Sequence, residues 1–525
     1  MNLHSRLFYF WRNFKFMFTE EKILSLTLEQ KVGLVLLPTL RPNASKRFID
    51  EFFAGVEPGG VFLFQGISAE YRQTIETITN LFGRKMLFAS DLESGAGRMI
   101  IDKGSLPVQM ALGAAGDKEL VYRAAAVTAR DAMDVGINWN FSPVADVAYN
   151  LANPIVSTRS FCKTEDVVAE MVVAAVKGMQ EHGMLATAKH FPGDGVDDRD
   201  QHLVLTENNF SYEQWLVKSG YPFIKAIEAG VSTIMIGHLA APQLEAHFGS
   251  KEQRLPSSVS PTIITKLLRE TLGFTGLVIT DALDMRGVLS VMERDTAMIA
   301  AFNAGADMLL FAQPKRDSKL FINAVNDGLI TENRLNEAVE RVIRLYKHSD
   351  ELVANKKDIS PSWSTAETVS RDITKKSVRV CRGKHFEPLN FAKGKKVLSM
   401  QFRSEQVYNA NHFNSLLIKS GATVLSYTEK DARELLMHNN LEEFDAVILS
   451  FIFTPHWGIN QIRPAGVYLR PLLHFLNKQL PNVIGISFGS PTIENDLGNF
   501  PTFINAFSPD TVTQERVYEL LDTGR

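Results

Sequence analysis

Eight short apolar runs between residues 32 and 312 constrain the fold of this chain more than any other feature. Each run is mostly apolar on both faces and ends in polar residues, which is typical of a strand in a parallel sheet. The runs are VGLVLLP (32–38), GGVFLFQ (59–65), MLFASD (86–91), INWNFSPVADV (137–147), MLATAKHF (184–191), STIMIGHL (232–239), GLVITDAL (276–283) and ADMLLFA (306–312).

Helical patterns lie between these runs. Residues 166–183 have apolar positions three and four apart and end in Gly, and residues 295–305 form another such pattern. In residues 260–273, Ser260 suits a helix cap and Pro261 a first turn. Strands alternating with helices predict a (β/α)8 barrel. A doubly wound sheet is the alternative, because spacing alone does not separate closed from open sheets, but the polar strand ends favour the barrel.

The chain of 525 residues is longer than one core usually serves. We expect an N-terminal arm and the barrel in residues 1–350, a polar linker in 351–375 and a smaller α/β sandwich domain in 376–525. The strand-like runs of that second domain are KKVLSMQF (395–402), GATVLSYT (421–428), FDAVILSFIF (444–453) and NVIGISFG (482–489).

Composition and charge limit the partners. A net charge of −3 gives no general reason to expect nucleic acid or an anionic membrane. Cys162 and Cys381 lie in different predicted domains, which argues against a disulfide framework and fits a reducing compartment. The aromatic N-terminal stretch lacks the apolar core of a signal peptide, and no run approaches the roughly 20 apolar residues of a membrane span. We therefore expect a cytoplasmic protein, and the sequence carries no signal for its oligomeric state.

Chemically reactive side chains follow several of the strand-like runs. A barrel gathers the C-terminal ends of its strands around one pocket, so these side chains are candidates for a site. They are Asp91, Asp146, Lys189, His190, His238 and Asp281. The carboxylate of Asp281 either caps the next helix or acts as a nucleophile toward the anomeric carbon of a sugar.

The loop KHFPGDGVDDRDQH (189–202) supplies the partner that a retaining glycosidase needs. Asp200 and His202 are two residues apart, so in an extended segment their side chains point to one side. A carboxylate placed there orients the imidazole and stabilises its protonated form. Histidine suits general acid/base catalysis because its ordinary pKa of about 6.5 lies near working pH. The acidic residues between the two ends of the loop are expected to be mostly solvated.

The same loop resembles the K-H-F-P-G-x-G…D-x-H signature of glycoside hydrolase family 3, in its β-N-acetylglucosaminidase branch. Further segments resemble the family in the expected order. They are LTLEQKVGLVLLP, DLESGAGRM, NFSPVADV, the RSF of STRSF, MIGHLAAP, GFTGLVITDALDM and, near the end, ISFGSPTIENDLGNFPTFINAFS. The chain departs from the pattern at Asp194, where many relatives have His, and at Gln201, where Ser is more usual.

The resemblance implies a role for each matching residue. Asp281 matches the nucleophile, and His202 matches the acid/base with Asp200 as its dyad partner. The residues that match sugar-binding positions are Lys189, His190, Asp91, Arg159 and Arg98, of which Arg98 matches a position that is either structural or sugar-binding.

Structural roles compete with these assignments at several positions. Lys189 could form a structural ion pair, and Arg159 could pair with Asp146 or Glu93 to hold the barrel mouth. Trp139 and Phe141 are interpreted as core residues rather than as a sugar platform.

The resulting hypothesis is an exo-acting retaining β-N-acetylhexosaminidase. Its implied substrates are GlcNAc-terminated glycosides such as peptidoglycan fragments, which would fit wall recycling. Three alternatives stay open: a β-N-acetylglucosaminide phosphorylase, a β-glucosidase with Glu494 as the acid/base, and an inactive sugar-binding protein. We expect no cofactor and no metal, because the acidic cluster lacks the EF-hand offsets and no nucleotide-binding fingerprint is present.

Overall fold

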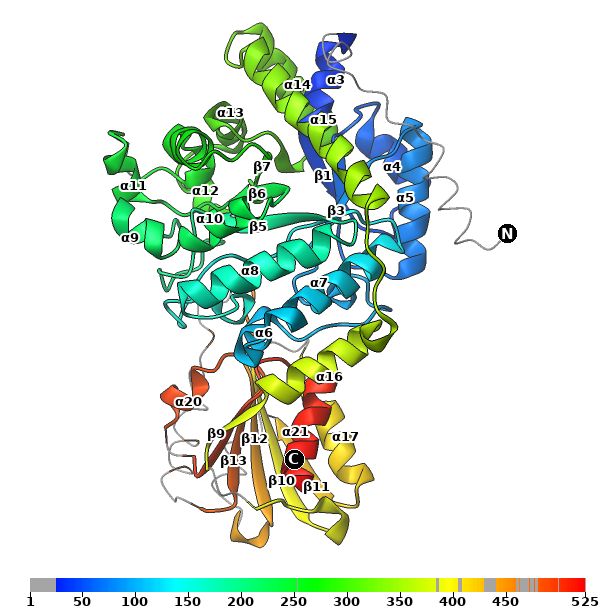
Figure 1. The fold of residues 1–525 in the computed structure, drawn as a ribbon, viewed down its shortest axis with the longest axis vertical. Coiled ribbons are helices and arrows are strands. Elements are labelled where there is room, and N and C mark those ends of the chain that lie inside the picture. Colours follow the sequence, from blue (N-terminus) through cyan, green and yellow to red (C-terminus); the bar gives the residue numbers. More distant parts are fainter. Residues whose placement is uncertain are drawn as a thin grey trace.

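The structure is a computed structural model. It describes residues 25–252, 254–383, 387–404, 408–428, 441–458, 462, 472, 476, 480–498 and 500–524. The predicted N-terminal arm, residues 1–24, lies outside the described residues. Figure 1 shows a large body built on one sheet and a smaller body built on another, with helix α16 between them.

The larger body is a nearly closed barrel of eight parallel strands in the order β7-β6-β5-β4-β3-β2-β1-β8. β1 pairs with β8, and a single bridge between Ile279 and Met308 links β7 to the end of the ring. The strands are β1 (Leu36–Leu40), β2 (Gly60–Leu63), β3 (Leu87–Ser90), β4 (Trp139–Asn140), β5 (Leu185–Phe191), β6 (Thr233–Ile236), β7 (Leu277–Thr280) and β8 (Leu309–Ala312). The predicted barrel is confirmed.

All eight strands are shorter than their apolar runs, and two of them differ most from the prediction. The run at 32–38 divides between helix α3 (Leu28–Leu34) and β1, because the capping box of Thr27 and Gln30 starts a helix there. The run at 137–147 forms only the two residues of β4. The chain beyond β4 stays beside β5 through one bridge between Val144 and Lys189.

The barrel interior is packed with large side chains. Trp139 is fully buried, and its indole N–H lies 2.9 Å from the Thr187 hydroxyl and 3.1 Å from that of Thr233. Phe141 is also fully buried and stacks on Phe62. The interpretation of Trp139 and Phe141 as core residues is therefore correct.

Helices surround the barrel, as Figure 1 shows. Among the outer helices, α8 packs against both α7 and α10. The main outer helices are α5 (Ser68–Phe82), α7 (Lys118–Met133), α8 (Glu165–Gln180), α10 (Tyr221–Glu228), α13 (Arg294–Ala304), α14 (Pro314–Asn326) and α15 (Glu332–Ala354). The predicted helix at 260–273 is a π-helix over Thr262–Thr271, and the Ser260 hydroxyl accepts a hydrogen bond from the N–H of Ile263.

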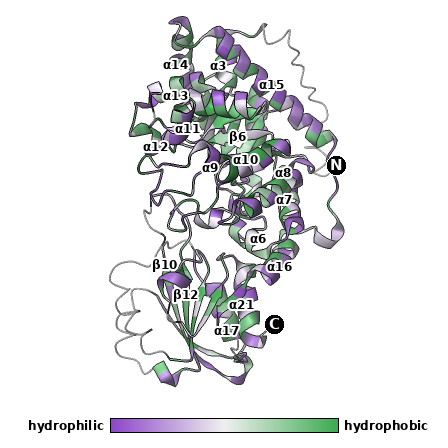
Figure 2. Ribbon diagram, turned by 60° about the vertical axis from the view of Figure 1, so that its left-hand side comes forward, coloured by the Kyte–Doolittle hydropathy of each residue, from purple (hydrophilic) through white to green (hydrophobic). Residues whose placement is uncertain are grey.

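The smaller body holds a six-stranded sheet in the order β11-β10-β12-β13-β14-β9, in which only β9 runs antiparallel to its neighbour. The strands are β9 (Arg379–Arg382), β10 (Lys396–Arg403), β11 (Thr423–Thr428), β12 (Ala446–Ile452), β13 (Val483–Ser487) and β14 (Thr502–Asn505). Its central strands are hydrophobic along their length (Figure 2). Separate apolar clusters contain alternate residues of β10 and β12, so both faces of the sheet are covered.

Helix α16 (Ala366–Ser377) joins the two bodies. It packs on α6 (Gln109–Ala115) and α7 of the barrel and on α21 (Thr511–Thr523) of the smaller body. An ion pair between Lys376 and Asp117 and a hydrogen bond from the Ser370 hydroxyl to the Ser105 carbonyl add to this contact. The predicted linker, residues 351–375, thus contains the last residues of α15 and most of α16.

Within the described residues, none of the helices combines the length and the apolar character that crossing a bilayer requires.

Candidate active site

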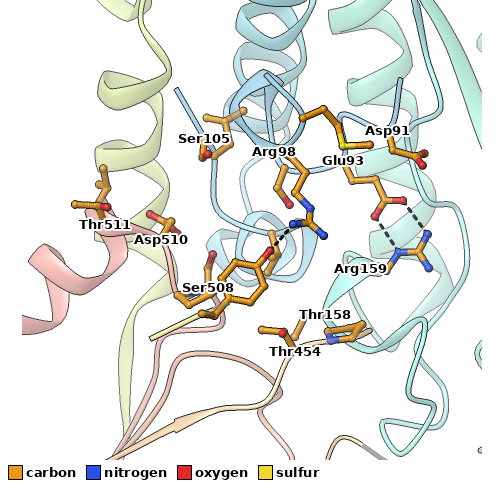
Figure 3. Close-up of a pocket in the computed structure, with 18 of the residues that line it drawn as sticks. Asp91, Glu93, Arg98, Ser105, Thr158, Arg159, Thr454, Ser508, Asp510 and Thr511 are labelled. Carbon is orange, nitrogen blue, oxygen red and sulfur yellow. Dashed lines mark hydrogen bonds and ion pairs between the residues drawn. The ribbon is translucent and has the colours of Figure 1, made fainter. Parts of the chain in front are cut away.

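A cavity of about 830 Å³ lies between the mouth of the barrel and the second domain. The barrel contributes charged side chains to its wall, and Figure 3 shows Asp91, Glu93, Arg98 and Arg159 on that side. His202 also lines the cavity. The second domain contributes Tyr408, residues 454–457 and residues 508–512. The site is therefore built by both domains.

An ion cluster follows the end of β3 in the cavity wall. Glu93 binds Arg159 through both carboxylate oxygens, at 2.9 Å from Nε to Oε2 and 2.8 Å from Nη2 to Oε1 (Figure 3). The Nζ of Lys189 lies 2.7 Å from Asp91 Oδ1 and 2.7 Å from Glu93 Oε1. Two carboxylates thus face two cations at the point where the sequence predicted sugar-binding residues.

Electrostatics keep this cluster charged. Burial by itself raises the pKa of Glu93, but the neighbouring Arg159 guanidinium and Lys189 ammonium hold it well below its usual range. For Lys189 the signs are reversed: burial lowers its pKa, but the charges of Asp91 and Glu93 outweigh burial and raise the pKa above its ordinary value. Glu93 is not among the predicted site residues; the sequence names it only as one of two possible partners of Arg159. Arg159 does pair with Glu93, whereas the other possible partner, Asp146, binds His190.

His190 connects the ion cluster to Asp281. Its backbone N–H donates to Asp146 Oδ1 at 3.1 Å, and its ring Nδ1 donates to Asp146 Oδ2 at 2.7 Å. The other ring nitrogen, Nε2, lies 3.5 Å from Arg159 Nη2 and 3.9 Å from Asp281 Oδ2. The ring therefore joins the cavity wall to the carboxylate at the end of β7.

Asp281 follows directly after β7, and its side chain is 15% exposed. Its Oδ1 accepts a hydrogen bond of 2.7 Å from the N–H of Ala282. Burial raises the pKa of Asp281, but the nearby His190 imidazole and the hydrogen bond from the Ala282 N–H outweigh it and lower the pKa. The group is ionised near neutral pH, as a nucleophile must be.

His238 braces the chain that follows Asp281. It is fully buried, with Nε2 donating to the Ala282 carbonyl at 2.8 Å and Nδ1 2.7 Å from the Ser258 hydroxyl. Burial lowers the pKa of His238, so the ring is neutral and donates only one ring proton. His238 therefore holds the backbone next to Asp281 in position.

Asp200 and His202 form the predicted pair, but they do so in a turn that begins at Asp200 and not in the expected extended segment. The fully buried Asp200 Oδ1 accepts from the backbone N–H of His202 at 2.7 Å and from its ring Nδ1 at 2.8 Å. The Oδ2 of Asp200 accepts a 2.8 Å hydrogen bond from the N–H of Gly458 in the second domain. Burial raises the pKa of Asp200, while the bonds from His202 and Gly458 lower it overall.

The acidic residues of the loop are less solvated than expected. Asp194 is 2% exposed, and its backbone N–H donates to Asp146 Oδ1 at 2.8 Å. Its Oδ1 accepts from Gly195 and Asn153, whereas its Oδ2 has no hydrogen-bond partner within the described part of the chain. Burial and the charge of Asp146 raise the pKa of Asp194 to about 7. The expectation of a solvated loop is therefore wrong at Asp194, because the loop folds back onto Asp146.

Arg98 and Glu494 differ in their distance from the site. Arg98 lines the cavity, and its Nη1 donates to the Tyr408 hydroxyl of the second domain at 2.5 Å. Glu494 lies in α20 (Ile493–Asp496), where its Oε2 accepts from Asn505 at 3.1 Å. Among the described residues that line the cavity, Glu494 does not occur.

Charged and imidazole groups at the C-terminal strand ends of a parallel barrel are the arrangement of a barrel enzyme, here partly covered by a second α/β domain. The chain belongs to glycosyl hydrolase family 3, whose N-terminal domain model matches residues 27–345.

Relatives with known names cover part of the chain. The chain is 39% identical to a β-N-acetylglucosaminidase/β-glucosidase of Cellulomonas fimi over 321 residues. The aligned segment covers 60% of this chain and 57% of that protein. The chain is 30% identical over 280 residues to a β-hexosaminidase of Hydrogenovibrio crunogenus, which is 52% of this chain and 75% of that protein. The chain thus aligns with little more than half the length of the first of these relatives.

Solved structures match both domains. A β-glucoside phosphorylase, BglX, has a TM-score of 0.83 at 25% identity and covers 96% of this chain and 93% of its own. A family 3 β-N-acetylglucosaminidase from Paenibacillus sp. str. FPU-7 has a TM-score of 0.80 at 24% identity, covering 95% of this chain and 97% of its own. The second likeness shows the shared fold.

Proposed function

We propose that this chain is an exo-acting retaining β-N-acetylhexosaminidase that removes terminal GlcNAc from glycosides such as peptidoglycan fragments. One observation carries the proposal: the Asp200–His202 pair lies at the same cavity that His190 connects to the ionised Asp281. The name of the Hydrogenovibrio crunogenus relative supports a hexosaminidase, and the name of the Cellulomonas fimi relative supports GlcNAc alongside glucose as the sugar.

The proposed reaction has two steps. In the first, an Asp281 carboxylate oxygen bonds to the anomeric carbon while the glycosidic C–O bond breaks and His202 protonates the leaving oxygen. The proton comes from Nε2, because Nδ1 is bound to Asp200. In the second, His202 takes a proton from water, the water oxygen bonds to the anomeric carbon, and Asp281 leaves as a carboxylate.

The remaining predicted residues are proposed to hold the sugar. The Lys189 ammonium and Asp91 carboxylate, 2.7 Å apart, offer donors and acceptors for hydroxyl groups. Arg159 adds a guanidinium fixed by Glu93, and His190 approaches Asp281 from the same wall. Arg98 is proposed to bind from the opposite edge, where it already contacts Tyr408.

A β-N-acetylglucosaminide phosphorylase is the second candidate. The structural likeness to a β-glucoside phosphorylase favours it. A histidine acid/base also repels an incoming phosphate less than a carboxylate would. A β-glucosidase that uses Glu494 receives less support, because Glu494 is bound to Asn505 away from the described cavity wall.

The setting proposed for this activity is the cytoplasm, in the recycling of wall fragments. The support for it is that Cys162 and Cys381 form no disulfide with each other and lie in different domains.

Four assays test the function: p-nitrophenyl β-GlcNAc and p-nitrophenyl β-glucoside, each with and without phosphate. We expect release of p-nitrophenol from the GlcNAc substrate without phosphate, with GlcNAc as product. GlcNAc 1-phosphate as the major product would select the phosphorylase. Activity on the glucoside alone would exclude the proposed sugar, and no turnover of either substrate would favour a sugar-binding protein.

A further inference from the structure

The loop that follows β12 brings the second domain into contact with the acid/base pair. β12 is a central strand, buried along its whole length and paired with β10 and β13. The loop residues 454–457 line the cavity, and the next residue, Gly458, donates its N–H to Asp200 Oδ2 at 2.8 Å. The contact therefore comes from a loop that follows a buried central strand of the second domain.

The two oxygens of Asp200 are held from two different domains. Oδ1 accepts both hydrogen bonds of His202, whereas Oδ2 accepts the bond of Gly458. A fully buried carboxylate depends strongly on such bonds, because no water replaces a lost donor. The orientation of the Asp200 carboxylate sets the direction of the His202 ring, so the Gly458 N–H acts on that ring through Asp200.

We propose that the second domain positions the acid/base of this enzyme through the backbone N–H of Gly458. Gly458 is a positioning residue: it touches Asp200 and acts on the reacting atoms only through His202. The proposal rests on the proposed glycosidase function. It gives the second domain a catalytic purpose, since Gly458 lies beyond the residues matched by the family's N-terminal domain.

The chemistry of the first step separates a positioning role from a structural one. A sugar or alkyl leaving group departs only when its oxygen receives the proton from His202. A 2,4-dinitrophenolate leaving group is already stable as an anion and departs without that proton. A misplaced His202 therefore slows the first class of substrate and spares bond breaking in the second, whereas general damage to the fold slows both.

Two substitutions weaken the contact to different degrees. Gly458 has a φ of +81°. Gly458→Pro removes the N–H and cannot adopt this φ. Gly458→Ala keeps the N–H, and its Cβ meets no atom of the described residues within 4 Å, so the positive φ is what opposes it there. The matched control is Gly394→Pro, which replaces another second-domain glycine with a positive φ of +70° and open space around it.

The experiment measures kcat/KM on 2,4-dinitrophenyl β-GlcNAc and on N,N′-diacetylchitobiose. We expect Gly458→Pro to lose about 10- to 100-fold on chitobiose and less than about 3-fold on the dinitrophenyl substrate. Gly458→Ala should show the same selectivity with a smaller loss, and it supplies the readout if the Pro variant does not fold. Gly394→Pro should change both substrates equally.

Equal losses on both substrates, or no loss on chitobiose in a folded Gly458 variant, would overturn the positioning role. Thermal unfolding of each variant identifies the folded ones. Failure of the proposed function is a separate result, because the unaltered protein would then turn over neither GlcNAc substrate.

Discussion

Both oxygens of the Asp146 carboxylate accept hydrogen bonds from His190, one from its backbone N–H at 3.1 Å and one from its ring at 2.7 Å. The two bonds fix the position of the residue and the rotation of its ring together. They leave Nε2 facing Asp281 at 3.9 Å. Asp146 is fully buried and is thus a support for a residue of the predicted site rather than a sugar ligand.

The first prediction concerns this support. Asp146→Ala should lower kcat/KM on p-nitrophenyl β-GlcNAc by about 100-fold, because a misplacement near 1 Å costs this much in a preorganised site. Asp317→Ala is the control: this fully buried carboxylate binds Arg294 and lies outside the described cavity wall. Comparable activity losses in folded samples of both variants would show that Asp146 matters only for folding.

The second prediction concerns the proposed nucleophile. Asp281→Asn removes the negative charge that attacks the anomeric carbon but keeps the oxygen that accepts from Ala282. We expect kcat to fall by several orders of magnitude while the free energy of unfolding changes little. Asp284→Asn, an exposed carboxylate three residues further on, should retain near-normal activity. Near-normal turnover by Asp281→Asn would remove Asp281 from this role.

The third prediction concerns the buried Asp194, whose pKa is raised from 3.8 to about 7. Between these two pKa values, Asp194 is still protonated in the folded chain but has lost its proton in the unfolded chain. Folding is therefore penalised increasingly as pH rises from about 4 to about 7, and the penalty is complete above pH 7. Asp194→Asn removes the penalty. Its free energy of unfolding, relative to the unaltered protein, should rise by on the order of 1–4 kcal/mol between pH 4 and pH 8.

Asp197 offers a control of opposite sign in the same loop. Burial raises the pKa of Asp197, but the bonds from Arg199 and from the N–H of Glu207 lower it below its ordinary value. Asp197→Asn should therefore lose stability relative to the unaltered protein as pH rises through the acid range. Denaturant unfolding at several pH values measures both variants. Parallel pH curves for Asp194→Asn and the unaltered protein would show that Asp194 is not protonated near neutral pH.

The sequence predicts those parts of the fold that depend on local pattern. The run MLATAKHF (184–191) forms β5 over Leu185–Phe191. Asp200 and His202 are in contact as predicted, although in a turn and not in an extended segment. Local sequence pattern does not predict strands whose formation depends on pairing with distant segments of the chain. The short strands β9 and β14 of the second domain carry little signal of their own, and β14 pairs with both β13 and β9.

The same limit applies to the site. Glu93 looks like one more polar residue after β3, and only the folded chain brings Arg159 and Lys189 to it, 66 residues or more further along the sequence. The bond between Gly458 and Asp200 spans 258 residues. A glycine N–H leaves no mark in the sequence, so the contribution of the second domain to the acid/base pair appears only in the structure.

The last prediction concerns Glu93. Glu93→Gln leaves Arg159 and Lys189 with one carboxylate, Asp91, in place of two. Removing one member of this partly buried ion cluster costs about 1–3 kcal/mol, which is less than for a fully buried pair because Asp91 and Arg159 keep part of their contact with water. We expect a loss of this size in denaturant unfolding and a raised KM, since Arg159 no longer has a bidentate partner. Glu367→Gln, which changes an exposed carboxylate of the same cavity, should alter stability by less than about 0.5 kcal/mol. Unchanged stability and KM in Glu93→Gln would mean that the cluster does not hold the sugar-binding wall.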